Sequence, residues 1–283
     1  MREKFMRKSA LFVLLSVVAT PVFAQRRAEF LPQNHLFQPL LLDPLEAQAG
    51  GSLVKRWDEG KAVSGLFAPF AIGFRKPLVR WTRDEEHASE LAFDVGVFTQ
   101  FEMFTDDRGN YRRFMYNADY KVSLSYALRR GSGAWRFRFY HLSSHLGDDY
   151  IIRQRIASAY PDANNYEQFD VLYATQRGGW RHYGGGGLVI SAAARRKRPY
   201  LQAGTLFKTG GEVVRFIAGA DLRLLAQTGY TPNVKAGIGL EVGKPENRPL
   251  QFLLEGYAGK LPYSTYEERR TAWVGLGVYL NPF

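Results

Sequence analysis

The 283-residue sequence contains no cysteine, so disulfide bonds cannot stabilise this protein. It also lacks long hydrophobic runs. After Gln25 no segment reaches the roughly 20 apolar residues that a membrane-spanning helix requires. Hydrophobic residues make up only 46% of the chain, and the mean hydropathy is −0.28. These absences exclude a disulfide-stapled fold and a helical membrane protein, and they leave a large continuous sheet as the expected source of stability.

Residues 1–24 have the three parts of a secretory signal peptide. The positively charged start contains Arg2, Lys4, Arg7 and Lys8. An apolar run follows at residues 10–19, and the segment ends in Val22-Phe23-Ala24, which is typical of a cleavage site. The apolar run is too short to cross a bilayer as a helix. We therefore predict export of the chain and cleavage after Ala24.

Most of the remaining sequence alternates between apolar and polar residues. Within residues 116–128, every second residue is apolar or aromatic and those between are mainly polar, which is the signature of a β-strand. Eleven such strands are predicted, at about residues 62–73, 89–103, 113–128, 134–145, 167–176, 180–190, 199–208, 212–224, 232–242, 249–260 and 270–283. A twelfth near residues 52–57 would give the even number expected of an outer-membrane barrel.

The length of these strands favours a membrane barrel over a soluble sandwich. Many reach the 9–11 residues that cross a bilayer when tilted, whereas sandwich strands average about 5–6. The aromatics near strand ends are predicted to form girdles at the membrane interfaces; they are Trp135, Trp180, Tyr183, Tyr257, Trp273 and Tyr279. We predict an all-β protein with a single antiparallel transmembrane β-barrel of about twelve strands over residues 59–283, located in the outer membrane.

The ends of the chain suggest how the barrel is oriented. The terminal Phe283 closes an amphipathic last strand, which resembles the signal read by the barrel insertion machinery, although Asn281-Pro282 breaks the alternation. With Phe283 at the periplasmic rim, the longest connection, residues 146–166, falls outside. The connection at residues 75–89 is long yet falls inside, against the usual asymmetry. Residues 25–58 are predicted to form a periplasmic N-terminal segment, with residues 40–42 against the barrel floor.

The other face of each strand is predicted to line the lumen. It carries both signs of charge: Asp94, Asp119, Lys121, Arg136, Arg138, Arg215, Asp221, Arg223, Lys235, Glu241 and Glu255. Mixed charges favour a lumen filled by salt bridges over an ion-selective ring. Twelve strands also enclose less space than the 16–18 strands of aqueous porins. A wide pore is therefore not expected, and a non-catalytic envelope barrel or a narrow channel is the alternative to any enzyme.

Reactive side chains are densest at residues 136–150. This stretch, together with the surrounding barrel, resembles an uncharacterised family of bacterial outer-membrane proteins known only as a domain of unknown function. The resemblance covers most of the mature chain. It implies an outer-membrane location and a barrel fold, and it implies no activity.

A shorter resemblance concerns the pair His141-x-Ser143, which is similar to the His-x-Ser motif of outer-membrane lipid A 3-O-deacylases. Those serine esterases act on the outside of the barrel, and a carboxylate from the next strand orients the histidine. The resemblance covers residues 136–167 and implies Ser143 as nucleophile, His141 as base and Glu167 as the orienting carboxylate. The sequence departs from the motif at Ser144, where the deacylases have Asn, and the deacylase barrels are smaller.

The residues alone lead to the same three side chains. The period of two places His141 and Ser143 on the lipid-facing side of one strand, and Glu167 on the same side of the next. A serine, a histidine and a carboxylate are the parts of an activated nucleophile, which needs no metal or organic cofactor. Two alternatives stay open. In the first, the side chains serve only as headgroup-level hydrogen-bonding groups; in the second, His141 and His145 bind a metal with Asp148 or Asp149.

Positive charge gathers in the predicted outer loops. The residues predicted to bind lipopolysaccharide phosphates are Arg153, Arg155, Arg195, Arg196, Lys197 and Arg198. Solvated loop charge is the alternative interpretation. Nucleic acid would fit the formal net charge of +11, but the outside of a barrel rarely meets it, so no nucleic-acid partner is expected.

The barrel prediction is testable on cell membranes. We expect the protein to be extracted with the outer membrane, and an unheated sample to migrate differently on a denaturing gel from a heated one. A closed barrel has no free sheet edge, so it resists detergent until heat opens it. Recovery as a soluble periplasmic protein would contradict the prediction.

Overall fold

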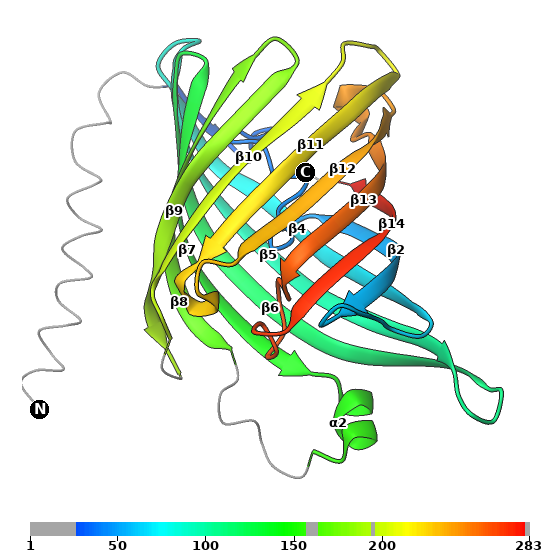
Figure 1. Cartoon of the computed structure of the whole chain (residues 1–283). Coiled ribbons are helices and arrows are strands. Elements are labelled where there is room, and N and C mark those ends of the chain that lie inside the picture. Colours follow the sequence, from blue (N-terminus) through cyan, green and yellow to red (C-terminus); the bar gives the residue numbers. More distant parts are fainter. Residues whose placement is uncertain (1–26, 157–163, 194–195, 281–283) are drawn as a thin grey trace, which may run out of the picture.

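The computed structural model describes residues 27–156, 164–193 and 196–280. The predicted signal peptide, Arg195 and Phe283 lie outside these residues. The chain forms a closed antiparallel barrel (Figure 1), in which twelve strands, β2 and β4 to β14, each pair with two neighbours. The barrel closes where β2 pairs with both β14 and β4. The predicted fold class is confirmed.

The barrel strands are β2 (Ala49–Asp58), β4 (Leu66–Thr82), β5 (His87–Thr105), β6 (Tyr111–Arg130), β7 (Gly133–Leu146), β8 (Asn165–Arg177), β9 (Trp180–Ala192), β10 (Pro199–Lys208), β11 (Val214–Leu225), β12 (Pro232–Val242), β13 (Leu250–Lys260) and β14 (Arg270–Leu280). Two short strands pair antiparallel with the ends of longer ones: β1 (Arg27–Phe30) with the end of β4, and β3 (Lys61–Ala62) with the end of β2. Among the described residues the helical elements are α2 (Asp148–Gln154), η1 (Ala226–Thr228) and η2 (Pro245–Asn247). Within the described residues, no helix is long and apolar enough to cross a membrane.

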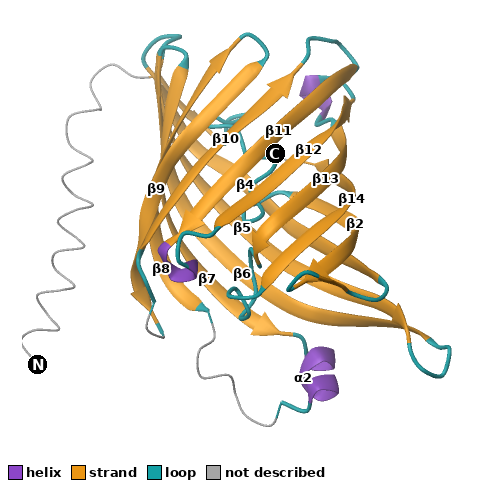
Figure 2. Cartoon of the chain, viewed as in Figure 1, coloured by secondary structure: helices purple, strands orange, loops and turns teal. Residues whose placement is uncertain are grey.

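The two rims of the barrel differ (Figure 2). At one end, here called the turn rim, connections such as residues 131–132 and 178–179 are short. At the other end, the loop rim, lie the long connection that carries α2 and the connection at residues 261–269. Outer-membrane barrels place short turns in the periplasm and long loops outside. On that rule the loop rim is the outer one.

Alternation along the strands sorts the side chains as predicted. All eleven charged residues predicted to face the lumen are buried. Apolar residues on the opposite face are exposed on the barrel exterior, for example Leu124, Phe139 and Leu276. A large apolar exterior over a charged interior is the inverse of a soluble protein and suits a lipid environment.

The predicted aromatic girdles are partly wrong. Trp135 and Trp180 lie on the exterior, but the other four aromatics are buried; these are Tyr183, Tyr257, Trp273 and Tyr279. The rings of Tyr257 and Trp273 stack with centroids 4.2 Å apart. Their position in the alternation places them inward, where their rings fill the lumen, and the hydroxyl groups of the three tyrosines form hydrogen bonds there.

A β-bulge reverses another expected face. The β5–β6 pairing shifts by one residue between Gln100 and Phe101, which leaves Tyr116 as the extra residue of β6. In the alternation of residues 116–128, Tyr116 falls among the apolar residues of the lipid-facing side, but it is buried and packs against Tyr150 with ring centroids 4.7 Å apart. An extra residue in one strand re-aims a side chain because it breaks the period of two.

The connection predicted at residues 75–89 is also wrong. Strand β4 continues to Thr82 and β5 begins at His87, so only four residues connect them. Pro77 obscured the strand in the sequence because proline has no amide hydrogen for a ladder bond. The register shifts between Pro77 and Val79, so an irregularity accommodates the proline. This connection at the turn rim is therefore short, like the others named above.

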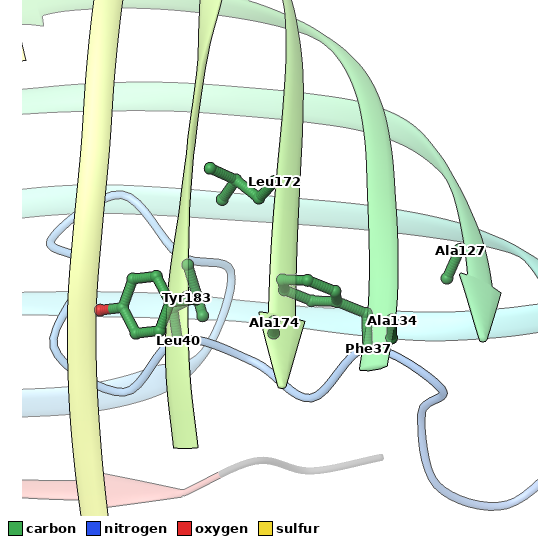
Figure 3. Packing of buried hydrophobic residues seen from close by; sticks show 7 residues of the cluster. All are labelled: Phe37, Leu40, Ala127, Ala134, Leu172, Ala174 and Tyr183. Carbon is green, nitrogen blue, oxygen red and sulfur yellow. The ribbon is translucent and has the colours of Figure 1, made fainter. Parts of the chain in front are cut away.

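The N-terminal segment lies inside the barrel, not beneath it. Residues 31–48, here called the lumenal plug, enter the lumen, and Phe37 and Leu40 pack on Leu172, Ala174 and neighbouring wall residues (Figure 3). Strand β2 begins at Ala49, so the barrel starts ten residues before the predicted boundary at residue 59. The twelfth strand predicted near residues 52–57 is β2, and it supplies the closure.

Buried ion pairs hold the lumenal plug to the barrel wall. Glu46 lies 2.8 Å from an Arg136 nitrogen and 3.4 Å from an Arg138 nitrogen. Asp43 lies 3.4 Å from Arg223, and Lys121 donates to the Leu45 carbonyl. Removing one partner of such a pair leaves an uncompensated buried charge, which costs about 3–5 kcal/mol.

The plug generates a prediction on Glu46. Glu46→Gln should lower the free energy of unfolding by about 3–5 kcal/mol, because Arg136 loses its carboxylate partner. The measurement is urea unfolding of the barrel in detergent micelles. Glu212→Gln is the control, since Glu212 is exposed in a turn.

The same variant tests whether the lumen is closed. In planar bilayers the wild type should show no large, steady conductance steps, because the plug and its ion pairs occupy the lumen. Steps that appear only in Glu46→Gln would show that the ion pairs keep the plug in place. Large steps in the wild type would instead make the protein a porin.

Candidate functional site

The candidate site lies on the exterior of the barrel, where β7 approaches the loop rim. Alternation along β7 turns His141, Ser143 and His145 outward, while Leu142 and Ser144 are buried on the lumen side. The predicted shared face of the three outward residues is therefore correct. Because β7 is hydrogen-bonded to a neighbouring strand on each side, it holds these positions more rigidly than a loop would.

His141 and Glu167 form the first pair of the site. They are direct partners in the β7–β8 ladder, and His141 Nδ1 lies 2.9 Å from Glu167 Oε1. A neutral imidazole that donates from Nδ1 to a carboxylate presents Nε2 as a proton acceptor. The structure thus brings together the predicted base and its predicted orienting carboxylate.

Ser143 forms the second pair, with a residue that was not predicted to contact it. Its hydroxyl lies 3.0 Å from His145 Nε2. The His145 ring in turn meets Tyr120 edge-on, with centroids 5.6 Å apart. The sequence did carry a signal for this contact, because His141 and His145 stand two residues to either side of Ser143 on the same face.

Ser143 lies between two histidines along β7. Residues two apart on a strand are about 7 Å apart on one face, which is within reach of a serine and a histidine side chain. Rotation about the Ser143 Cα–Cβ bond moves the hydroxyl from one neighbour towards the other. Rotamer changes of this kind in exposed residues occur in picoseconds to nanoseconds.

Two hydrogen-bond donors close to Ser143 in the sequence, the Gly147 amide and the Ser144 hydroxyl, are not available to an oxyanion on the outer face. The Gly147 amide donates to the Tyr116 carbonyl at 3.0 Å, and the Ser144 hydroxyl donates to Asp119 inside the lumen at 2.8 Å. The cross-strand neighbours of Ser143 are Tyr120 on β6 and Asn165 on β8. Both flank the serine on the outer face and carry hydrogen-bond donors.

The predicted phosphate-binding residues divide into two groups. Arg153 is paired with Glu102, and Arg196 is paired with Glu267 and mostly buried. These two cations are neutralised within the protein, Arg153 by a carboxylate of β5 and Arg196 by one of the connection at residues 261–269. Exposed positions are held by Arg155, Lys197 and Arg198.

The described residues contain no group of three or more histidine, cysteine, aspartate or glutamate side chains placed to hold a metal ion. The proposed set of His141, His145 and Asp148 or Asp149 therefore does not come together. Asp149 accepts a hydrogen bond from the Met115 amide at 3.3 Å.

Comparison with known proteins identifies both a family and a fold. Residues 14–281 match the family described as "Protein of unknown function (DUF1207)". A search of curated proteins returns no match. The barrel is similar to the Salmonella typhi outer membrane phospholipase dimer with bound calcium, with a TM-score of 0.57, 14% identity and coverage of 88% of this chain and 94% of that one. It is also similar to Escherichia coli outer membrane phospholipase A, with a TM-score of 0.58, 12% identity and coverage of 88% and 95%.

Proposed function

The chain belongs to the DUF1207 family, and we propose that this outer-membrane β-barrel is a serine esterase that cleaves acyl esters of membrane lipids. One observation carries the proposal. A histidine held by a carboxylate, His141–Glu167, stands beside Ser143 on the membrane-facing surface. Polar and ionisable groups on such a surface are costly unless they have a partner or a function.

The reaction begins when Ser143 turns its hydroxyl from His145 to His141. Oγ attacks the ester carbonyl while His141 Nε2 takes the hydroxyl proton. Collapse of the tetrahedral intermediate breaks the ester C–O bond, and His141 returns the proton to the departing lipid alcohol. Water then attacks the Ser143 acyl ester with the same assistance, which releases the fatty acid and restores the serine.

Glu167 acts through His141. Its carboxylate accepts a hydrogen bond from Nδ1–H, so it keeps the imidazole in the tautomer that can take a proton at Nε2. It also stabilises the imidazolium formed during attack. The direct cross-strand pairing of the two residues means that the sheet itself sets this geometry.

The developing oxyanion requires hydrogen-bond donors beside Ser143. Tyr120 and Asn165, the two cross-strand neighbours, supply a phenolic hydroxyl and a side-chain amide on the same outer face. Donors of this kind are strongest where water is excluded, as in the acyl layer of a membrane.

The substrate class follows from location. The site lies on the lipid-facing surface near the loop rim, where acyl esters of outer-leaflet lipids meet their headgroups. The fold shared with outer membrane phospholipase A and the short resemblance to lipid A deacylases both support a lipid acyl ester. Exposed Arg155, Lys197 and Arg198 suit the phosphates of lipopolysaccharide.

A non-catalytic envelope barrel is the second candidate. His141 bonds to Glu167 and Ser143 bonds to His145, so these side chains have hydrogen-bond partners without a substrate. The ion-paired lumen also fits a barrel whose role is structural.

The two candidates differ in what single substitutions do. We expect Ser143→Ala and His141→Ala to abolish fatty-acid release from lipid micelles, and Glu167→Gln to lower kcat by roughly 10⁴-fold because the imidazole loses its fixed tautomer. The measurement is free fatty acid released by the purified barrel, with folding checked by heat-dependent gel mobility. Unchanged lipid, with folded mutants that behave like the wild type, would favour the structural role.

His145→Gln identifies the base. It should retain at least about a tenth of the wild-type kcat, since His145 holds the resting serine and is not the carboxylate-bound histidine. Full loss in His145→Gln together with an active His141→Ala would assign the base to His145. Mass spectrometry of lipids from cells with and without the protein distinguishes loss of an acyl chain from lipid A from loss of one from phospholipid.

A further inference from the structure

Directly behind Ser143, on the lumen side of the same strand, a connection from across the barrel folds inward. Residues 261–269, here called the closing loop, connect β13 to β14 at the loop rim. Leu261 and Ser264 are buried. Tyr263 packs with Phe98 of β5, with ring centroids 6.1 Å apart. The loop therefore reaches into the lumen as far as β5, which lies three strands from β14 around the barrel.

Asp119 on β6 is the centre of this contact. Its carboxylate accepts hydrogen bonds from the Ser264 amide at 2.8 Å, the Ser144 hydroxyl at 2.8 Å and the Asn117 side-chain amide at 2.9 Å. Asp119 is 1% exposed. One buried carboxylate thus joins the closing loop to β6 and to the residue that follows Ser143.

Asn164 forms a second attachment between the closing loop and the site. Its side-chain amide donates to the Ser264 carbonyl at 2.9 Å, and its own carbonyl accepts the Ser144 amide at 2.7 Å. Arg196 donates to the Asn164 side-chain oxygen at 3.0 Å and pairs with Glu267 of the loop. Hydrogen bonds therefore connect the closing loop both to β7 and to the residue that precedes β8.

These attachments meet where the β7–β8 ladder ends. Ser143 and Asn165 are the last Cα partners of that ladder, and His141 and Glu167 lie only two residues away. Strand ends open more readily than strand centres. Without a brace, the separation of Ser143 from the His141–Glu167 pair would vary with the opening of the two strands.

We propose that Asp119, Ser144 and Ser264 are positioning residues, which act through the backbone of β7 and β8 to hold Ser143 in register with His141 and Glu167. The inference rests on the proposed esterase function and extends it to residues that lipid does not touch. A displacement of about 1 Å at a reacting group can lower a rate about 100-fold. A brace at this point is therefore worth as much to the rate as a direct contact.

The test uses Asp119→Asn, which keeps the shape of the side chain but removes one acceptor. The control is Asp221→Asn. Asp221 is equally buried in the lumen and accepts hydrogen bonds from Tyr183 at 2.6 Å and Gln202 at 2.8 Å, but it lies on β11. Ser144→Ala removes a single bond to Asp119, and Ser144→Thr keeps the hydroxyl.

The readout is the rate at which a fluorophosphonate labels Ser143 in the full mature chain, measured beside kcat, KM and the urea midpoint. We expect labelling and kcat to fall about 10- to 100-fold in Asp119→Asn and Ser144→Ala, with KM within about twofold. Ser144→Thr should restore the rate. Asp221→Asn should keep the wild-type rate even where its urea midpoint falls as far.

Each other outcome overturns a specific claim. Wild-type labelling in both Asp119→Asn and Ser144→Ala, or an equal loss in Asp221→Asn, would reject the brace and leave the esterase intact. Absence of Ser143 labelling in the wild type would reject the esterase and, with it, the brace. If Asp119→Asn fails to insert, Ser144→Ala and Ser144→Thr decide the question.

Discussion

The ion pairs of Glu46 with Arg136 and Arg138 are the interaction on which the rest of the structure depends. A twelve-stranded barrel is too narrow for a wide water channel and too wide to be filled by wall side chains of ordinary size. The lumenal plug occupies that space, and its carboxylates meet the guanidinium groups of the wall. A single buried charge would be very costly in the interior, but these opposite charges pair and attach the plug to the wall.

With the lumen occupied by the plug, the proposed esterase site lies on the exterior of the barrel. Strand β7 shows the division clearly, since Arg136 and Arg138 face the plug while His141 and Ser143 face lipid. The inner face anchors the strand, and the outer face presents side chains whose spacing the anchored strand then maintains. The closing loop repeats this arrangement at the loop rim through Asp119. A reaction on a membrane surface gains from such rigidity because water and lipid provide none.

The errors of sequence interpretation arose where a period of two was interrupted or where residue type was trusted over position. Tyr116 faces inward because a bulge adds one residue to β6. Pro77 lies within β4 because an irregularity accommodates it. Tyr257 and Trp273 stack inside the lumen, although their ring types are common at membrane interfaces. The first two cases have a local cause that the amino-acid pattern does not reveal, whereas the alternation itself already places Tyr257 and Trp273 on the lumen side.

By itself, the sequence determined the barrel, the number of its strands and the face on which nearly every charged strand residue lies, because alternation is a local property that the pleat converts directly into inside and outside. It also determined that His141 and Glu167 share an outer face. Only the tertiary structure decided that the N-terminal segment fills the lumen, that Ser143 rests against His145, and that Arg153 and Arg196 are neutralised by Glu102 and Glu267. Those contacts join residues by the closure of the sheet and by the folding of its loops, and no periodicity along the chain encodes which distant residues such closure brings together.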